Sequence, residues 1–222
     1  WEESIDRSSD LKKECNLSSR EILDKIAAAG IVGKGGATFP THVKLTPPPG
    51  SRPEILIING VECEPWLTSD HRLMMERTEE IMVGITIVMK ALNVDKAIIG
   101  IENNKKDAIE KFGKCAETYP GISVEALKVQ YPQGGEKQLI DALIGRQVPS
   151  GALPISVGVV VQNVGTVLAI YEAVQKNKPL IERIVTVTGK DVKQPCNILS
   201  RVGIPVGNLI DAAGGLPETT GK

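Results

Sequence analysis

Three glycines and a lysine follow one another at residues 33–36, where the sequence reads Gly33-Lys34-Gly35-Gly36. Glycine has no Cβ, so glycines this dense let backbone N–H groups crowd around a ligand. Successive N–H groups in such a loop form a concavity for anions, typically phosphate. Lys34 would add a mobile positive charge, and Phe39 a flat face for stacking. These residues alone predict a phosphate-binding loop, with a flexible surface connector as the open alternative.

The stretch does not match the glycine fingerprint of dinucleotide-binding βαβ folds. That fingerprint needs a third glycine three positions after the second, and a strand directly before the loop. Thr38 stands at the third place. The preceding residues favour a helix instead, because Ser18 and Glu21 form a capping box and Gly30 can end the apolar stripe of residues 22–27. The loop is therefore expected to follow a helix.

The rest of the chain alternates between two kinds of apolar pattern. Short apolar runs predict strands at residues 55–58, 97–101, 122–129 and 157–161, and helical spacing predicts helices at 79–92, 105–118, 136–144 and 166–175. Strands that alternate with helices predict an α/β fold with a mainly parallel sheet and flanking helices. Beyond Pro179 the pattern changes to alternation and glycine- or proline-broken segments, which predicts a small β-rich module after a boundary near residue 181.

Polar and glycine-rich segments follow three of the predicted strands. They are Asn59–Pro65, Tyr131–Glu136 and Gln162–Thr166, and each contains amide or carboxylate side chains beside glycine. Ligands of open α/β sheets bind outside the carboxyl ends of the strands. We therefore expect these three segments and the glycine loop to converge on one ligand.

Composition excludes several classes of function. The 26 basic and 27 acidic residues leave a net charge of −1, which gives no electrostatic basis for binding nucleic acid. No apolar run approaches the roughly 18 residues of a membrane span, so direct membrane insertion is not expected. The four cysteines lie far apart in the sequence and form no C-x-x-C pair, so no local motif predicts a zinc or iron–sulfur site. Scattered cysteines of this kind fit a reducing compartment. The chain opens at Trp1 rather than Met, which indicates a piece of a longer protein.

Taken together, the four segments resemble the family formed by the C subunit of the Rnf electron-transport complex (RnfC). They also resemble the related flavin-binding subunit of respiratory NADH dehydrogenase. The matching residues are Gly33–Thr41 with Lys44, Asn59–Pro65, Asp70–Arg72, Tyr131–Glu136, Arg146–Pro149 and Gln162–Thr166. The resemblance runs from about residue 18 to the end of the chain.

This resemblance implies an FMN-binding domain that accepts hydride from NADH. It assigns the FMN site to Gly33, Gly35, Lys44, Asn59, Glu62, Tyr131, Gly134, Glu136, Asn163 and Thr166. It assigns the NADH site to Lys34, Phe39, Glu64 and Glu136. No protein nucleophile or general acid is expected, because flavin and nicotinamide carry the hydride chemistry themselves.

The residue types suit these implied roles. Glu62, Glu64 and Glu136 can accept hydrogen bonds from ribose hydroxyls or flavin N–H groups, and lysines can offset phosphate charge. Apart from the family, Glu64 could equally be a solvated loop acid, Phe39 a plug at the core edge, and Lys44 a surface lysine.

The resemblance also implies a domain layout. Residues 1–17 would form an N-terminal extension, 18–181 the FMN- and NADH-binding α/β domain, and 182–222 part of a soluble-ligand-binding β-grasp module. The family's cysteine-rich motifs for a pair of four-iron clusters follow that module, outside this chain. Val61 and Gly135 stand where the respiratory relatives usually carry acids, which fits the Rnf branch.

In the intact complex, electrons would pass from NADH through FMN and iron–sulfur clusters toward membrane partners and ferredoxin. The protein would be cytoplasmic and peripheral, held on the inner face of the cell membrane by other subunits of the complex. Two alternatives stay open. One is a cobalamin reductase paralogue of the same family, and the other is a non-catalytic scaffold that binds a nucleotide or a partner.

Overall fold

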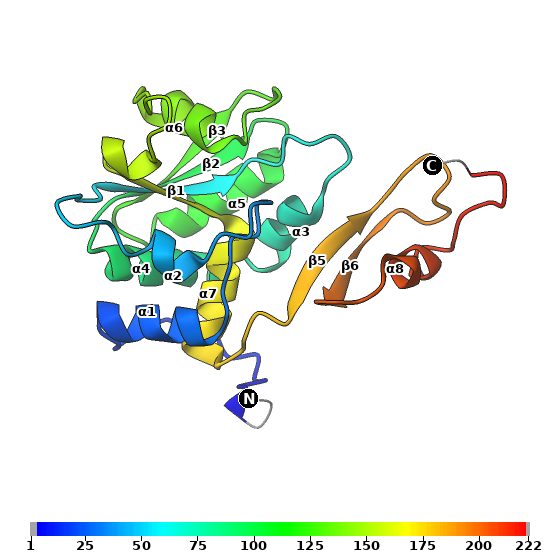
Figure 1. Cartoon of the computed structure of the whole chain (residues 1–222), viewed down its shortest axis with the longest axis horizontal. Coiled ribbons are helices and arrows are strands. Elements are labelled where there is room, and N and C mark those ends of the chain that lie inside the picture. Colours follow the sequence, from blue (N-terminus) through cyan, green and yellow to red (C-terminus); the bar gives the residue numbers. More distant parts are fainter. Residues whose placement is uncertain (1–3, 221–222) are drawn as a thin grey trace. The chain divides into compact units, whose positions relative to one another are not determined.

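The computed structural model describes residues 4–220, which form two compact units (Figure 1). The first unit contains residues 4–63 and 70–180 and carries the sheet and most of the helices. The second unit contains residues 64–69 and 181–220. The short segment 64–69 thus belongs with the C-terminal residues, a division that the sequence does not predict.

The first unit is built on a parallel sheet of four strands in the order β3-β2-β1-β4. The strands are β1 (Ile55–Gly60), β2 (Ala97–Glu102), β3 (Ile122–Leu127) and β4 (Val159–Asn163). Ile58 of β1 lies opposite Ile99 of β2 and Gln162 of β4. All four strands therefore end at the same edge of the sheet. The predicted fold class, a mainly parallel sheet with flanking helices, is confirmed.

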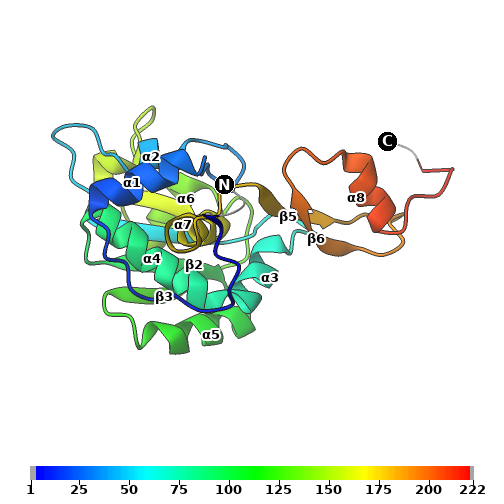
Figure 2. The ribbon, with the colours of Figure 1, turned by 90° about the horizontal axis from the view of Figure 1, so that it is seen from below.

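Helices cover both faces of this sheet (Figure 2). They are α1 (Ser19–Ala28), α2 (Thr41–Lys44), α3 (Ser69–Glu76), α4 (Thr78–Leu92), α5 (Lys106–Ala116), α6 (Glu136–Ile144) and α7 (Val164–Lys176), with a 3-10 helix at Pro154–Val157. On one face, Leu139 and Ile140 of α6 pack on Ile57 and Val161 of the sheet. Helices α1, α4 and α7 pack together on the other face.

Helix α1 has the predicted start and stop. Ser18 accepts a hydrogen bond from the Glu21 backbone, and the Glu21 side chain accepts one from the Ser18 backbone, so the capping box is present. Gly30 follows the C-cap with a φ of +65°, a left-handed conformation that favours glycine. Helices α2 and α3 were not predicted, because the first has four residues and the second has only a short apolar spacing.

The N-terminal extension is held against α7 by hydrogen bonds. The buried Lys176 ammonium donates to the carbonyl oxygens of Ser8, at 3.2 Å, and Asp10, at 2.5 Å. The hydroxyl of fully buried Tyr171 accepts from the Lys12 backbone at 3.2 Å. A buried ammonium requires such partners, so the polar extension satisfies groups at the end of α7 that the fold would otherwise leave unpaired.

The second unit is a two-stranded antiparallel ribbon with one short helix. Strands β5 (Glu182–Val187) and β6 (Cys196–Arg201) pair with Val185 opposite Ile198, and α8 (Val206–Ala212) follows. Segment 64–69 joins this ribbon through Asn197, whose amide nitrogen donates to Thr68 Oγ1 at 2.9 Å. The alternating pattern seen in the sequence after Pro179 corresponds to β5.

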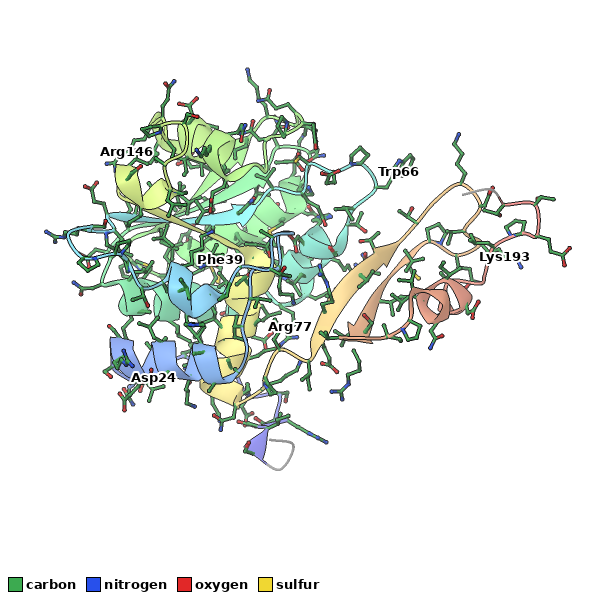
Figure 3. All side chains as sticks on the ribbon, viewed as in Figure 1. Asp24, Phe39, Trp66, Arg77, Arg146 and Lys193 are labelled. Atoms are coloured by element: carbon green, nitrogen blue, oxygen red, sulfur yellow. The ribbon has the colours of Figure 1, made fainter. Side chains whose placement is uncertain are left out.

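Helices α4 and α7 pack directly on one another in the first unit. A Cβ on Gly84 of α4 would lie 2.6 Å from the carbonyl oxygen of Val167 and 2.8 Å from its Cγ1. Arg77, at the start of α4, also pairs with Glu80 and, at 3.2 Å, with Glu172 of α7 (Figure 3). These carboxylates, Glu80 foremost, raise the pKa of Arg77.

We predict that Gly84→Ala destabilises the protein by about 1–3 kcal/mol, because the added methyl group must push α4 away from α7. Gly113→Ala is the matched control, since a Cβ there meets nothing within 4 Å and alanine favours a helix by about 1 kcal/mol. Urea unfolding of both variants measures the two effects. Equal stability of Gly84→Ala and the parent chain would contradict this packing.

All four cysteines are free thiols. Burial, followed by the nearby Glu79 carboxylate, raises the pKa of the Cys115 thiol to about 11. At pH 8 about one Cys115 in a thousand is then a thiolate, against about one in four for an ordinary cysteine. We predict that iodoacetamide alkylates Cys115 far more slowly than a model cysteine peptide at pH 8, and that the difference closes near pH 11. Peptide mass spectrometry follows this labelling.

Candidate functional site

The glycine loop lies against the start of α7, at the edge where the four strands end. The Lys34 N–H donates to the Thr166 hydroxyl at 2.9 Å. A Cβ on Gly35 would lie 3.6 Å from the Cβ of Asn163, the last residue of β4. The loop and the end of β4 are therefore neighbours, as the convergence of the loops requires.

The loop itself is a short, tied turn. Val32 and Pro40 form an antiparallel bridge, and the Gly33 N–H donates to the Phe39 carbonyl at 2.9 Å. Gly36 has a φ of +121°, which only glycine adopts readily. The loop is thus anchored at both ends and also, through Lys34, to α7. A flexible connector would lack these bonds.

Several backbone donors of this loop point to no protein acceptor. Within residues 4–220, the N–H groups of Gly35, Gly36 and Ala37 make no hydrogen bond, and all three residues are exposed. Consecutive exposed N–H groups form an anion-binding concavity. This donor set fits the phosphate of a flavin mononucleotide, and it is the chemistry that the glycine pattern predicts.

The segments after β1 and β3 are joined to each other. The Asn59 side chain donates to the Gly134 carbonyl at 2.9 Å and accepts from the Val61 N–H at 3.0 Å. The Gly134 N–H donates to the Cys63 sulfur at 3.3 Å. A Cβ on Gly134 would lie 3.2 Å from that sulfur, a tight contact, so the close approach favours glycine there.

Two of the predicted FMN-binding residues pair with one another. Lys44, at the end of α2, donates to Glu136 Oε1 at 2.5 Å. Glu136 is the first residue of α6, where the helix dipole favours a carboxylate. Both side chains are half-buried, so the ammonium keeps access to a ligand with its other two N–H donors.

Glu62 has a structural contact that the sequence did not predict. Its carboxylate oxygens accept from the backbone N–H groups of Asp70, at 2.9 Å, and His71, at 3.2 Å, at the start of α3. The His71 ring in turn bonds Asp107 at 3.0 Å, and this hydrogen bond lowers the pKa of Asp107. Glu62 thus fixes α3 beside the site, while its contact with FMN stays a prediction.

Asp70 was not among the residues assigned to the FMN or NADH site, although it contacts one of them directly. Its Oδ2 accepts from the Asn163 amide at 2.6 Å. The sequence around Asp70 offered one local signal, an acid in the first turn of α3, the short helix that follows the polar segment after β1. The sequence did not show that this helix starts beside α7.

The remaining predicted residues differ in how they are placed. Phe39, labelled in Figure 3, is 51% exposed and Tyr131 is 69% exposed, so each side chain is accessible to a ligand. Thr166 is fully buried, and its hydroxyl oxygen accepts the hydrogen bond from the Lys34 N–H. Glu64 belongs to the second unit, and its assignment to the NADH site stays a prediction. The individual site assignments stay predictions.

A separate cavity of about 540 Å³ lies in the first unit. Its lining includes Ser9 of the extension, Glu79 of α4 and Cys115 of α5. None of the residues predicted to bind FMN or NADH lines it. Within the described part of the chain, no helix is long and apolar enough to cross a membrane, and no cluster of three or more potential metal ligands occurs.

Comparison with known families identifies the α/β unit as an FMN-binding domain. Residues 26–172 match the family model described as the Nuo51 FMN-binding domain, so the chain belongs to that family. Residues 184–222 match the SLBB domain model.

Curated relatives identify the branch. The chain is 50% identical over 218 residues to the C subunit of the proton-translocating ferredoxin:NAD(+) oxidoreductase complex of Clostridium ljungdahlii, covering 98% of this chain and 47% of that protein. It is 46% identical over 207 residues to the Na(+)-translocating counterpart of Acetobacterium woodii, covering 93% of this chain and 47% of that protein. The chain spans about half the length of these relatives. The predicted resemblance to the RnfC family is confirmed.

Solved structures agree with the fold. The NAD+-reducing [NiFe]-hydrogenase in its H2-reduced state matches with a TM-score of 0.73 and 25% identity. The match covers 88% of this chain and 39% of the hydrogenase chain.

We predict that Thr166→Val frees the glycine loop, because valine has the same shape but offers no acceptor to the Lys34 N–H. The lost hydrogen bond should cost about 1 kcal/mol. Amide hydrogen exchange at Lys34, whose N–H donates to this hydroxyl, should become faster in Thr166→Val and stay near the parent rate in Thr166→Ser, which keeps the hydroxyl. Equally fast exchange in both variants would show that the hydroxyl does not anchor the loop.

Proposed function

We propose that this chain is the FMN-binding, NADH-oxidising part of the C subunit of an Rnf-type ferredoxin:NAD oxidoreductase. The observation that supports it best is the glycine loop, whose exposed N–H groups lie beside the ends of the sheet strands. The Nuo51 FMN-binding domain match and the names of the curated relatives support the same interpretation.

The chain's own groups would divide the work of holding FMN. The loop N–H groups of Gly35 and Gly36 and the Lys44 ammonium would neutralise the phosphate. Asn59 and Glu136 would border the flavin ring. Asn59 is bonded to Gly134 in the segment after β3, and Glu136, which follows that segment, is paired with Lys44. Bound FMN supplies the hydride acceptor, and the protein supplies position and electrostatics.

The groups for NADH would lie around the exposed side of the same loop. The exposed Phe39 offers a face on which an aromatic ring can stack, and Lys34 belongs to the same loop. Glu136 would accept hydrogen bonds from hydroxyl groups of the dinucleotide. Hydride transfer between the two cofactors requires no acid or base from the protein, so these residues would act by orientation alone.

The wider role extends beyond this chain. Electrons would leave FMN through iron–sulfur clusters carried by a region outside the chain and move toward other subunits of a membrane complex and ferredoxin. The protein would be cytoplasmic and peripheral, held at the inner face of the membrane through those partners. The names of the relatives, which are subunits of ion-translocating complexes, support this proposal.

The test is an anaerobic titration of the purified chain with FMN, followed by NADH. We expect FMN uptake at micromolar concentration and bleaching of the flavin absorbance when NADH is added, because hydride transfer reduces the flavin. No FMN uptake would overturn the proposal. Uptake without bleaching would leave a flavin-binding module and remove the NADH-oxidising role.

Gly35→Leu gives this test its structural control. A Cβ on Gly35 makes only an ordinary contact, 3.6 Å from Asn163, so leucine should leave the fold intact while its side chain fills the space before the loop N–H groups. We expect at least about a tenfold loss of FMN affinity, equivalent to about 1.4 kcal/mol. Gly113→Leu, on the open side of α5, should bind FMN like the parent chain.

A further inference from the structure

Asn163 occupies a branch point between α3, α7 and the glycine loop. Its Oδ1 accepts from the N–H groups of Gly165, at 2.9 Å, and Thr166, at 3.3 Å, and so caps α7. Its Nδ2 donates to Asp70 Oδ2 at 2.6 Å. Only the oxygen can accept from two N–H groups and only the nitrogen can donate to a carboxylate, so these partners fix the orientation of the amide.

Asp70 also lies close to the first turn of α7. A Cβ on Gly165 would lie 3.6 Å from Asp70 Oδ1, so the carboxylate lies against the positive end of that helix. The position of Asp70 is itself determined, because its backbone N–H donates to Glu62 at 2.9 Å. A charge held in this way strengthens the hydrogen bond to the Asn163 amide.

The contacts continue from α7 to the glycine loop. Thr166, the third residue of α7, is fully buried, and its hydroxyl accepts from the Lys34 N–H. An Asn163 amide that turned away from α7 would release the N–H groups of Gly165 and Thr166. The helix end that carries the Thr166 hydroxyl would then loosen, and the loop would lose its fixed support.

We propose that Asp70 is a positioning residue of the candidate site, which keeps the glycine loop docked by holding the Asn163 amide against the first turn of α7. The proposal rests on the proposed function in so far as the loop serves FMN. It assigns to Asp70 no contact with FMN or NADH, and its effect reaches the loop through Asn163, Thr166 and Lys34.

The same contacts restrict where an anion can bind. The N–H groups of Gly165 and Thr166 are occupied by Asn163, and the Asp70 carboxylate repels a phosphate from the start of α7. The donors that remain at this place are those of Gly35, Gly36 and Ala37. Asp70 thus both supports the loop and leaves it as the preferred place for phosphate.

The test compares two substitutions of Asp70 in the 222-residue chain. Asp70→Ala removes the acceptor of the Asn163 amide, whereas Asp70→Asn keeps a carbonyl oxygen in its place. A hydrogen bond to a charged group is worth enough to expect about a tenfold loss of FMN affinity in Asp70→Ala, and Asp70→Asn should lie within about threefold of the parent chain. Flavin fluorescence measures both affinities.

A second measurement needs no flavin. Amide hydrogen exchange of the chain without FMN should become faster at Gly33 and Lys34, the hydrogen-bonded amides of the loop, in Asp70→Ala. It should return toward the parent rate in Asp70→Asn and stay unchanged in α4. The matched control is Asp107→Ala, which removes another carboxylate that contacts α3, through His71, but does not reach α7. This control should leave both the loop exchange and the FMN affinity unchanged.

The outcomes separate the two proposals. If the parent chain takes up no FMN, the proposed function fails, while the exchange measurement still decides whether Asp70 holds the loop. Parent-like loop exchange in Asp70→Ala would overturn the positioning role. So would an Asp70→Asn variant that is as impaired as Asp70→Ala, because the charge rather than the hydrogen bond would then be responsible.

Discussion

The arrangement of the site depends on the requirement that the first N–H groups of α7 find acceptors. A helix leaves its first four N–H groups without partners inside the helix, and here β4 runs directly into α7 at Asn163. The Asn163 side chain meets that requirement for two of them, and it can do so only while its amide is turned toward the helix. The same turn directs the amide nitrogen at Asp70 and places Thr166 under the glycine loop. One capping contact therefore determines the relative positions of three segments far apart in the sequence.

The polar groups of the candidate site are of two kinds: some form hydrogen bonds within the protein, and others are exposed without a partner among the described residues. Asn59 and Glu62 form hydrogen bonds with backbone groups of neighbouring segments, and Asn163 bonds both the backbone of α7 and the Asp70 carboxylate. The N–H groups of Gly35, Gly36 and Ala37, in contrast, meet no acceptor in the described part of the chain. Buried polar groups must be paired, but exposed N–H groups can be left to water or to a ligand. The amide and acid side chains thus hold the segments in place, and the backbone of the loop would provide the proposed binding surface.

The sequence predicted the sheet and its long helices because their apolar patterns are continuous, as in residues 55–58 and 79–92. It placed the start of α6 at Glu136 and the capping box of α1 at Ser18, where single residues carry the signal. It predicted a strand from residue 157, whereas β4 starts at Val159, because Gly158 has a φ of +75° after the 3-10 helix. It missed α3 and the contacts of Asp70 and Glu62, since a short helix and a long-range hydrogen bond leave no periodic pattern. The membership of segment 64–69 in the second unit depends on Thr68 and Asn197, 129 positions apart, and no local pattern reports such a pair.

Two ion pairs near the carboxyl edge of the sheet differ in how deeply their side chains are buried, and therefore in how easily they can open. Glu102, at the end of β2, and Lys105 form a pair at 2.5 Å whose side chains are 1% and 10% exposed. Separating such a buried pair costs several kcal/mol, about 3–5, because a charge is left without water. Lys44 and Glu136 are 33% and 37% exposed, and a pair in that environment contributes only about 0–1 kcal/mol. The Lys44 ammonium can therefore leave Glu136 at little cost, whereas Lys105 stays with Glu102. The difference in burial makes the ion pair of Lys44 easier to open than that of Lys105, which is the property that the proposed role of Lys44 at a phosphate requires.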